Sequence, residues 1–329
     1  MTESGTTAPP PTGSGGPAER IQHDQPPTGA DAMIVCDRLV RIYSGDGIEV
    51  QALQGLDLLI AEGELTAMIG AAGSGKSTLM NILAGLDTPT AGTVWVAGHN
   101  LGALTAKERL AYRRSIGGFI WQQTSRNLLP YLTARQNVLL PMRLSSLGRR
   151  ERLRRAGLLL QTLGIAHCAD RTPDRMSGGE QQRAAIATAL ANQPKVLLAD
   201  EPTGELDSST AQDVFSALQT ANTQLGATVL VVTHDPAVSS QVRRTIAIRD
   251  GRTSSETIRH AATDEHGRTA LHAREYATLD RAGRIQLPRE MTTRLRMRSR
   301  VQLQEEPDHI GVWPDQAAGQ EGDHRTPDS

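Results

Sequence analysis

The sequence has few cysteines, few lysines and few aromatic residues, and it contains no long apolar run. Its two cysteines, Cys36 and Cys168, lack the spacing of a metal site and suit a reducing compartment. No stretch approaches the roughly 20 apolar residues of a membrane span, and the N-terminus lacks the apolar core of a signal peptide. The net charge of the 329 residues is −1, which gives no overall field toward nucleic acid or an anionic membrane. These absences predict a soluble, intracellular protein.

Lysine occurs only as Lys76, Lys107 and Lys195, and the first of these stands inside a glycine-rich motif. Residues 70–78 read GAAGSGKST, between an apolar stretch that predicts a strand and a pattern that predicts a helix. In this context the backbone N–H groups and the helix N-terminus converge on phosphate oxygens. Lys76 supplies a charge for the β- and γ-phosphates, and Ser77 offers a hydroxyl to Mg²⁺. The motif therefore predicts a nucleotide site rather than a chance glycine-rich turn.

A pair of carboxylates, Asp200 and Glu201, ends a later apolar strand in the segment VLLADEP. Continuous apolar runs at 196–199 and 228–232 are typical of buried parallel strands, and strand and helix patterns alternate from Met33 onward, so we expect an α/β fold. Ligands of such folds bind at the carboxyl edge of the sheet. Asp200 suits the Mg²⁺ shell, and Glu201 suits the general base that activates the attacking water. Alone the pair is often a strand end that meets solvent, but beyond a phosphate loop it indicates nucleotide hydrolysis.

The segment MSGGEQQR at 176–183 opens a predicted helix. Ser177 is a good N-cap and Glu180 stands three positions on, as in a capping box. One interpretation is simply a well-capped helix. The other is a second anion site, formed by Ser177, Gly178 and Gly179 at the helix N-terminus.

These motifs, in this order, resemble the ATP-binding subunits of ABC transporters over about Met33 to Ile258. The resemblance implies an ABC-type P-loop NTPase with a RecA-like core, an antiparallel β subdomain and a helical subdomain. It also implies ATP and Mg²⁺ as ligands. Residues 177–181, SGGEQ, resemble the signature of that family. In that family two subunits pack head to tail with ATP between the phosphate loop of one and the signature of the other. We therefore expect a homodimer, or a heterodimer with a paralogue.

The resemblance assigns further roles residue by residue. Tyr43 resembles the aromatic residue that stacks on adenine, with a packed core aromatic as the alternative. Gln122 resembles the glutamine that contacts Mg²⁺ and water and senses the membrane partner, and Asp207 lies in the loop expected to cross the dimer interface. His234 resembles the switch histidine that touches the γ-phosphate.

The expected catalytic residues are Lys76, Gln122, Glu201 and His234, and the expected metal ligands are Ser77, Gln122 and Asp200. The expected nucleotide-binding residues are Tyr43, Gly70, Ala71, Ala72, Gly73, Ser74, Gly75, Lys76, Ser77, Thr78, Gln122, Ser177, Gly178, Gly179, Asp207 and His234. Ala71, Ala72 and Met176 depart from the common family pattern without removing a catalytic group, and Glu205 stands where Asn is common. We therefore expect an active ATPase that forms ADP and phosphate.

Segments 50–56, 81–90 and 128–138 resemble the lipoprotein-release, macrolide-export and cell-division group of ABC transporters. The resemblance implies an integral membrane permease with few spans, a groove over 123–142 that receives it, and a peripheral place on the cytoplasmic face of the membrane. The alternatives are a soluble ABC ATPase of the ribosome-acting or DNA-repair kind, and a nucleotide-dependent DNA-binding regulator.

The chain divides into five expected regions. Polar tails at 1–31 and 315–329 are predicted to be disordered, 32–258 is the ATP-binding domain, and 259–273 is a polar linker. Residues 274–314 resemble the AbrB-like swapped-hairpin barrel of bacterial regulators, with a short helix after Pro288 and two strands around Pro307. The arginines of this block are Arg281, Arg284, Arg289, Arg294, Arg296, Arg298 and Arg300. A dimerisation or regulatory role is favoured over DNA binding.

Overall fold

The computed structural model describes residues 32–45, 47–204, 206–263, 269–279, 283–298 and 300–314. The predicted disordered tails at 1–31 and 315–329, and also Glu205, Asp280 and Arg281, lie outside these residues. Of the helices in the described part of the chain, none has the length and apolar character that a membrane crossing requires.

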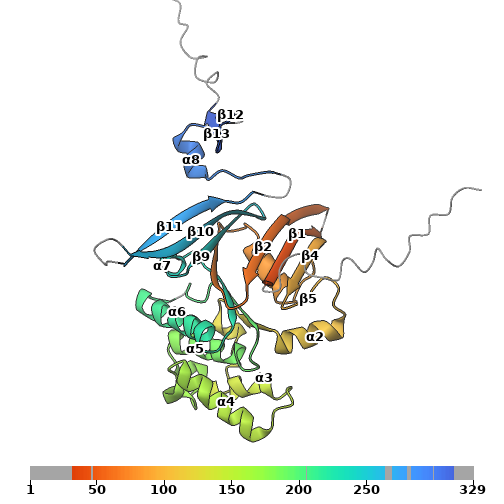
Figure 1. The fold of residues 1–329 in the computed structure, drawn as a ribbon. Coiled ribbons are helices and arrows are strands. Elements are labelled where there is room, and N and C mark those ends of the chain that lie inside the picture. The colour runs from red at the N-terminus through yellow and green to blue at the C-terminus, as the bar shows by residue number, and fades with distance from the viewer. Residues whose placement is uncertain are drawn as a thin grey trace, which may run out of the picture.

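The N-terminal sheet is antiparallel, and its strands lie in the order β2-β1-β4-β5 (Figure 1). These strands are β1 (Ala32–Gly45), β2 (Ile48–Ala61), β4 (Ala91–Val96) and β5 (His99–Asn100). The sequence pattern predicts two separate strands at Ile48–Leu53 and Leu56–Ile60, whereas β2 runs through both without a break. Gly55 adopts φ +87°, and β-bulges in the pairing with β1 let the ribbon bend without ending. This sheet is the expected antiparallel subdomain.

The larger sheet has a parallel centre and an antiparallel edge. Among the described residues its order is β11-β10-β9-β3-β8-β7-β6. The parallel strands are β3 (Leu65–Ile69), β6 (Gly117–Ile120), β7 (Val196–Asp200), β8 (Thr228–Val232) and β9 (Arg244–Arg249). All five residues of β8 and the first four of β7 are buried, which confirms the expectation from their continuous apolar runs. The carboxyl ends of β3, β7 and β8 therefore meet at one edge.

Helices cover this sheet and extend below it in Figure 1 as a helical subdomain. One hydrophobic core packs helices against β6–β8, and the other fills the space between the larger sheet and the N-terminal sheet. The helices are α1 (Lys76–Leu83), α2 (Ala106–Ser115), α3 (Ala134–Met142), α4 (Arg149–Thr162), α5 (Gly178–Ala189), α6 (Ser208–Thr223) and α7 (Pro236–Ser240), with 3₁₀ turns at Thr124–Arg126, Ala166–Cys168 and Pro173–Arg175. The sequence pattern from about Leu104 to Ala191 predicts a mainly helical region, and α2–α5 lie within it.

The predicted linker 259–273 is wrong where the structure describes it. Strands β10 (Arg252–Thr263) and β11 (Thr269–Ala277) pair in antiparallel register from Ser255↔Ala277 to Thr263↔Thr269 and extend the larger sheet. Residues 274–277 also belong to this sheet rather than to a separate block. Polar and charged residues suit a strand pair at a solvated sheet edge, and their composition alone does not reveal the pairing partner.

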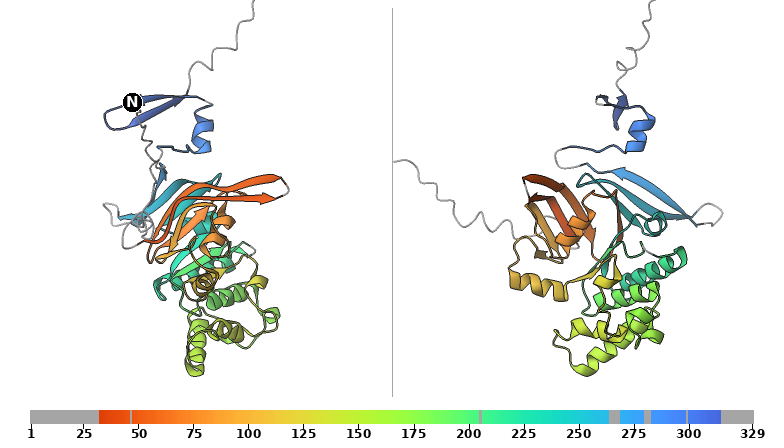
Figure 2. Two further views of the ribbon diagram at one scale, coloured as in Figure 1. Left: turned by 90° about the vertical axis from the view of Figure 1, so that its right-hand side faces the viewer. Right: turned by 180° about the vertical axis from the view of Figure 1, so that it is seen from behind.

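The rest of the C-terminal block follows the expected order of elements. Pro288 precedes α8 (Arg289–Arg294), and β12 (Val301–Glu305) pairs with β13 (Ile310–Pro314) around Pro307. Figure 2 shows α8 and this hairpin beyond the β10–β11 ribbon, apart from the helical subdomain. The resemblance to a swapped-hairpin barrel concerns an assembly of two chains and stays a prediction.

Phe215 offers a test of the helix–sheet core. Its side chain on α6 is fully buried in the core that packs against β7 and β8. We expect Phe215→Ala to lower the free energy of unfolding by about 3–5 kcal/mol, because it removes a large buried ring and leaves a cavity. The neighbouring exposed Ser216→Ala is the control and should change that free energy by less than about 0.5 kcal/mol. Urea unfolding measures both, and equal effects would contradict the assigned core.

Candidate nucleotide-binding site

The phosphate loop joins β3 to α1 with a backbone that glycine makes possible. Gly73 and Gly75 have φ of +77° and +101°, in the left-handed region that favours glycine. A Cβ on Gly75 would also lie 2.6 Å from the carbonyl oxygen of Ala52 in β2. Within the described residues no side chain caps the start of α1, and its first turn contains no acid. The first N–H groups of α1 are therefore left for an anion.

Lys76 holds its charge at the centre of this loop. Its ammonium donates to the carbonyl oxygens of Gly70 and Ala71, both at 2.8 Å, and contacts the Ser74 hydroxyl at 3.4 Å. The Lys76 residue is only 8% exposed. The Lys76 ammonium is thus buried against two loop carbonyls, next to the free N–H groups at the start of α1. A positive charge in this position can bind the phosphates of a nucleotide.

Asp200 ends β7 near this lysine. Burial, followed by the charge of Glu201, raises the pKa of Asp200, whereas Lys76 and Arg126 act in the opposite direction. Asp200 is partly buried. This position suits a carboxylate that approaches a cation and is shielded from bulk solvent. Ser77, in the first turn of α1, is exposed. Hydroxyl and carboxylate oxygens are the hard donors that Mg²⁺ prefers, so these residues fit the expected ion.

Glu201 meets His234 and Gln122 just beyond the sheet edge. Glu201 Oε2 lies 3.0 Å from His234 Nδ1, and the Glu201 N–H donates to Val232 at the end of β8. A Cβ built on Gly204 would lie 3.4 Å from Glu201 Oε2 and 3.5 Å from Gln122 Nε2, so the two side chains share one small region. Glu201 has φ +46°, a strained value for a residue with a side chain, which is typical of functional sites. The structure thus brings three expected catalytic residues together.

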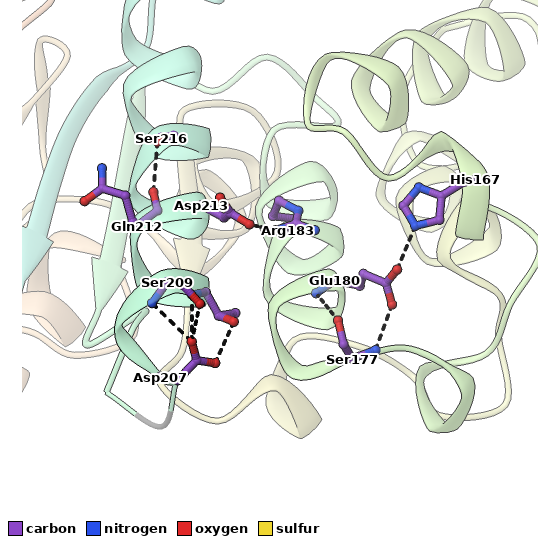
Figure 3. A network of polar contacts seen from close by, with 10 residues as sticks. His167, Ser177, Glu180, Arg183, Asp207, Ser209, Gln212, Asp213 and Ser216 are labelled. Carbon is purple, nitrogen blue, oxygen red and sulfur yellow. Dashed lines mark hydrogen bonds and ion pairs between the residues drawn. The ribbon is translucent and has the colours of Figure 1, made fainter.

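Ser177 is the N-cap of α5, and the capping-box interpretation is confirmed. Ser177 Oγ accepts from the Glu180 N–H, and Glu180 Oε2 accepts from the Ser177 N–H at 2.8 Å (Figure 3). Glu180 Oε1 lies 2.7 Å from His167 Nε2. The Ser177 N–H, followed by His167, lowers the pKa of Glu180. Ser177 and Gly178 remain exposed, so the cap does not remove them from the surface.

Asp207 fixes the start of α6 beside this signature. Its carboxylate accepts from the N–H and hydroxyl groups of both Ser209 and Thr210 (Figure 3). The hydroxyls of Ser209 and Thr210 hold the pKa of Asp207 well below its usual range. A Cβ on Gly179 would lie 2.3 Å from Thr210 Cγ2, so this glycine is required by close packing. The expected contact of Asp207 with nucleotide or a partner stays a prediction.

Tyr43 lies on β1 with its ring 38% exposed, which argues against the alternative of a packed core aromatic. Its hydroxyl donates to Asp87 Oδ2 at 2.8 Å, and the Arg41 guanidinium lies 4.3 Å from the ring centroid. Burial alone would raise the pKa of Asp87, but hydrogen bonds from Tyr43 and Thr88 and the neighbouring Arg41 lower it. These contacts fix the orientation of the ring.

Three supporting contacts have no local sequence signal. Arg41 and Asp87 stand 46 residues apart, and Thr210 meets Gly179 only in the folded chain. The Thr124 hydroxyl, two residues after Gln122, donates to Gln181 Oε1 at 3.2 Å. This bond joins the segment around Gln122 to α5. Only an alignment of homologues or the fold itself could have paired these positions.

Comparison with known proteins places these features in a family. A sequence profile described as ABC transporter matches residues 53–204. The macrolide export ATP-binding/permease protein MacB 1 of Yersinia pestis (bv. Antiqua, strain Antiqua) is 46% identical over 226 residues, 69% of this chain and 34% of that protein. MacB of Shigella flexneri is 47% identical over 211 residues, 64% of this chain and 32% of that protein. The chain therefore spans about a third of the length of these curated relatives.

Solved structures cover the same part of the chain. A dimeric ATP-binding cassette in a post-hydrolysis state, bound to ADP and Pi, matches with a TM-score of 0.62 and 38% identity, over 68% of this chain and 97% of that chain. The cbiO1 protein of Clostridium perfringens, part of an ABC transporter complex, matches with a TM-score of 0.62 and 30% identity, over 68% and 87%. The chain belongs to the ABC transporter family and carries the ATP-binding ATPase domain of that family.

Proposed function

We propose that this protein hydrolyses ATP to ADP and phosphate as the energy-coupling component of an ABC exporter. The observation that carries the proposal is the meeting of Glu201, His234 and Gln122 beside the phosphate loop. The relatives are named macrolide export ATP-binding/permease proteins, and these names support an outward transport role.

The geometry supports an in-line attack of water on the γ-phosphate. Lys76 and the N–H groups of the loop bind the phosphates and neutralise charge that develops during transfer. Glu201 accepts a proton from the attacking water, and His234, 3.0 Å from its carboxylate, orients that carboxylate. Gln122 lies where it can hold the water. When bound at Ser77, Asp200 and Gln122, Mg²⁺ supplies further charge neutralisation.

A second copy completes the site in this proposal. Ser177 and Gly178 are exposed at the N-terminus of α5, where they can meet a nucleotide held by another subunit. The dimeric cassette bound to ADP and Pi supports this arrangement. Each ATP would then be bound by the phosphate loop of one subunit and the signature of its partner.

Part of the expected permease groove, at Arg126, Asn127 and Pro141, borders a hollow that both polar and apolar residues line. Trp121 stacks near Phe119, with 4.2 Å between ring centroids, and Arg126 lies 3.8 Å over the Trp121 ring. These residues help to line a cavity of about 320 Å³ together with Pro141 and Leu144. Because Gln122 is the next residue after Trp121, a permease helix bound here would act directly on the catalytic region. This contact would place the protein at the cytoplasmic face of the membrane.

The C-terminal hairpin supports a second dimer contact. Val301, Leu303 and Ile310 share one face of the β12–β13 pair and are 39%, 66% and 69% exposed. An apolar face left open on a small hairpin suits burial against another copy of the same chain. Such a contact would keep two ATPase domains close together without nucleotide. The alternative of a DNA-binding regulator receives no support from the relatives.

Glu201→Gln tests the assigned general base. Replacing the carboxylate by an amide removes the proton acceptor and keeps the side-chain volume, so we expect kcat to fall by about 10²–10⁴-fold while MgATP still binds. Asp235→Asn is the matched control, because Asn still caps α7 and the residue contacts neither Glu201 nor Gln122 in the described structure. A colorimetric phosphate assay measures kcat, and an active Glu201→Gln protein would refute the role of Glu201.

The same variant tests the partner. With ATP and Mg²⁺, Glu201→Gln should trap the closed ATP-bound dimer, and gently solubilised membranes of the host should yield an integral membrane permease bound to it. A soluble dimer without a membrane protein, or a complex with DNA, would contradict the transporter proposal.

Gly179→Ala tests the signature through a designed rescue. The added methyl group would collide with Thr210 Cγ2, which the Asp207 hydrogen bond prevents from rotating away. We expect steady-state ATPase activity to fall at least about tenfold, because the signature would shift relative to α6. Thr210→Ser removes the colliding methyl and keeps the hydroxyl, so Gly179→Ala/Thr210→Ser should recover most activity. No recovery in the double variant would show that the contact is not the cause.

Leu303→Asp tests the C-terminal dimer contact. A charge at the centre of the apolar face should leave the nucleotide-free protein monomeric, as measured by light scattering after gel filtration. Gln304→Asp places the same charge on the opposite face of β12 and should leave a dimer. If both variants and the parent protein have the same mass, the proposed contact is wrong.

A further inference from the structure

The turn between β9 and β10 lies at the edge of the nucleotide site. Asp250 and Gly251 have φ of +50° and +70°, and Arg249 pairs with Arg252 across them. This is a tight two-residue hairpin turn with both central residues left-handed, for which Asp-Gly is a favoured sequence. Because β9 lies parallel to β3, the turn stands next to the loop that follows β3.

A direct hydrogen bond joins this turn to the phosphate loop. The Gly251 N–H donates to the carbonyl oxygen of Ser74 at 3.1 Å. Both segments also pack on the same point of β2: a Cβ on Gly251 would lie 2.7 Å from the Ala52 oxygen, and a Cβ on Gly75 would lie 2.6 Å from it. Neither glycine has room for a side chain, so the turn and the loop are held in close contact.

The other side of the loop also depends on β9. A Cβ on Gly70 would lie 2.4 Å from the carbonyl oxygen of Ile248. A cavity of about 430 Å³ beside these contacts is lined by residues 69–74 and 247–250. The contacts at Ser74 and Gly70 therefore fix the position of the loop along one wall of this cavity.

A C-terminal segment touches the same turn. We call residues 283–288, which lead into α8, the strap. Gln286 Nε2 donates to Asp250 Oδ2 at 3.3 Å, and Arg249 Nη1 donates to the Leu287 carbonyl oxygen at 3.4 Å. Ile285 forms a β-bridge with Leu279. The residue before Leu279, Thr278, donates its N–H to the carbonyl oxygen of Ser254 in β10. Figures 1 and 2 show this connection passing from the β10–β11 ribbon to α8.

We infer that the strap positions the phosphate loop through the Asp250–Gly251 turn, so that docking of the C-terminal block raises the affinity of the loop for nucleotide. The inference rests on the proposed function only in that this loop binds the phosphates. A turn held from outside keeps Ser74 and the adjoining N–H groups in their binding arrangement, and a pre-organised site binds more tightly than a mobile one. Asp250, Gly251 and Gln286 are thus positioning residues.

Thermodynamic linkage makes the effect reciprocal. If docking of the strap strengthens nucleotide binding, nucleotide must strengthen docking by the same factor. The Gly251 N–H, bonded to Ser74, reports on the contact between the turn and the loop, and the Thr278 N–H, bonded to Ser254 of β10, reports on the segment next to the strap.

Two substitutions at Asp250 separate the contact from the charge. Asp250→Gly and Asp250→Asn both remove the carboxylate charge and both keep a sequence that favours this turn. Only Asn retains a side-chain oxygen that can accept from Gln286. We expect Asp250→Gly to bind MgADP about two- to fivefold more weakly than Asp250→Asn, the range of a single partly exposed hydrogen bond. Isothermal titration with MgADP, which is not hydrolysed, measures the Kd.

A pair of glutamines supplies the second comparison. Gln286→Ala should weaken MgADP binding. Gln304→Ala should not, because among the described residues the Gln304 side chain on β12 bonds to Glu306 of its own hairpin and not to the turn. The double variant Asp250→Gly/Gln286→Ala should bind MgADP no more weakly than either single variant. Both substitutions remove the same hydrogen bond, so their effects should not add. In hydrogen exchange, MgADP should slow exchange at Thr278 in Asp250→Asn more than in Asp250→Gly.

The outcomes are distinct. Equal Kd values for Asp250→Gly and Asp250→Asn, or exchange at Thr278 that MgADP does not change, would overturn the inference. Additive losses in the double variant would do the same, because they would show two independent effects. A parent protein that fails to bind MgADP would refute the proposed function itself, whereas normal binding without these differences refutes only the role of the strap.

Discussion

The parallel pairing of β3 with β8 and of β8 with β7 is the constraint on which the site depends. It brings three chain segments, far apart in sequence, to one edge of the larger sheet: the phosphate loop after Ile69, the carboxylates Asp200 and Glu201, and His234. A shift of one residue in either pairing would turn the buried apolar strands over and separate these groups. All five residues of β8, Thr228 included, are buried, so both faces of this central strand pack inside the core.

Packing contacts around this edge connect the catalytic groups to the signature. Thr124 bonds Gln181 on α5, Gly178 lies close to Leu206, and Gly179 packs against Thr210 on α6. One contact network therefore connects the segment around Gln122, helix α5 and the start of α6. A movement of the segment around Gln122 must be accommodated by α5. This is a physical route by which a partner bound near Trp121 would influence the surface proposed to face a second subunit.

Local motifs made the central site predictable, and long-range contacts account for what the sequence did not reveal. Lys76, Asp200 and Glu201 each stand in a short pattern whose chemistry and neighbouring strand are visible in consecutive residues. By contrast, residues 259–273 resembled a linker because their polar composition hides the pairing of β10 with β11. The Arg41–Asp87 support of Tyr43 and the Gly251–Ser74 bond join positions with no spacing rule between them. Sequence predicts what a segment can do, whereas these contacts depend on which segments the fold brings together.

The pairing of β10 and β11 also changes how the C-terminal block can act. A flexible linker would keep the C-terminal block near the ATP-binding domain, but it could not pass a conformational change to it, because its two ends move independently. Here β10 pairs with β9, β9 pairs with β3, and β3 leads into the phosphate loop. Gln286 and Leu287 in turn contact Asp250 and Arg249 at the end of β9. In the proposed C-terminal dimer, a rearrangement of α8 and the β12–β13 hairpin would therefore either preserve these contacts or act on the loop that they support. The proposed assembly of two chains would then be linked mechanically to the geometry of the nucleotide site.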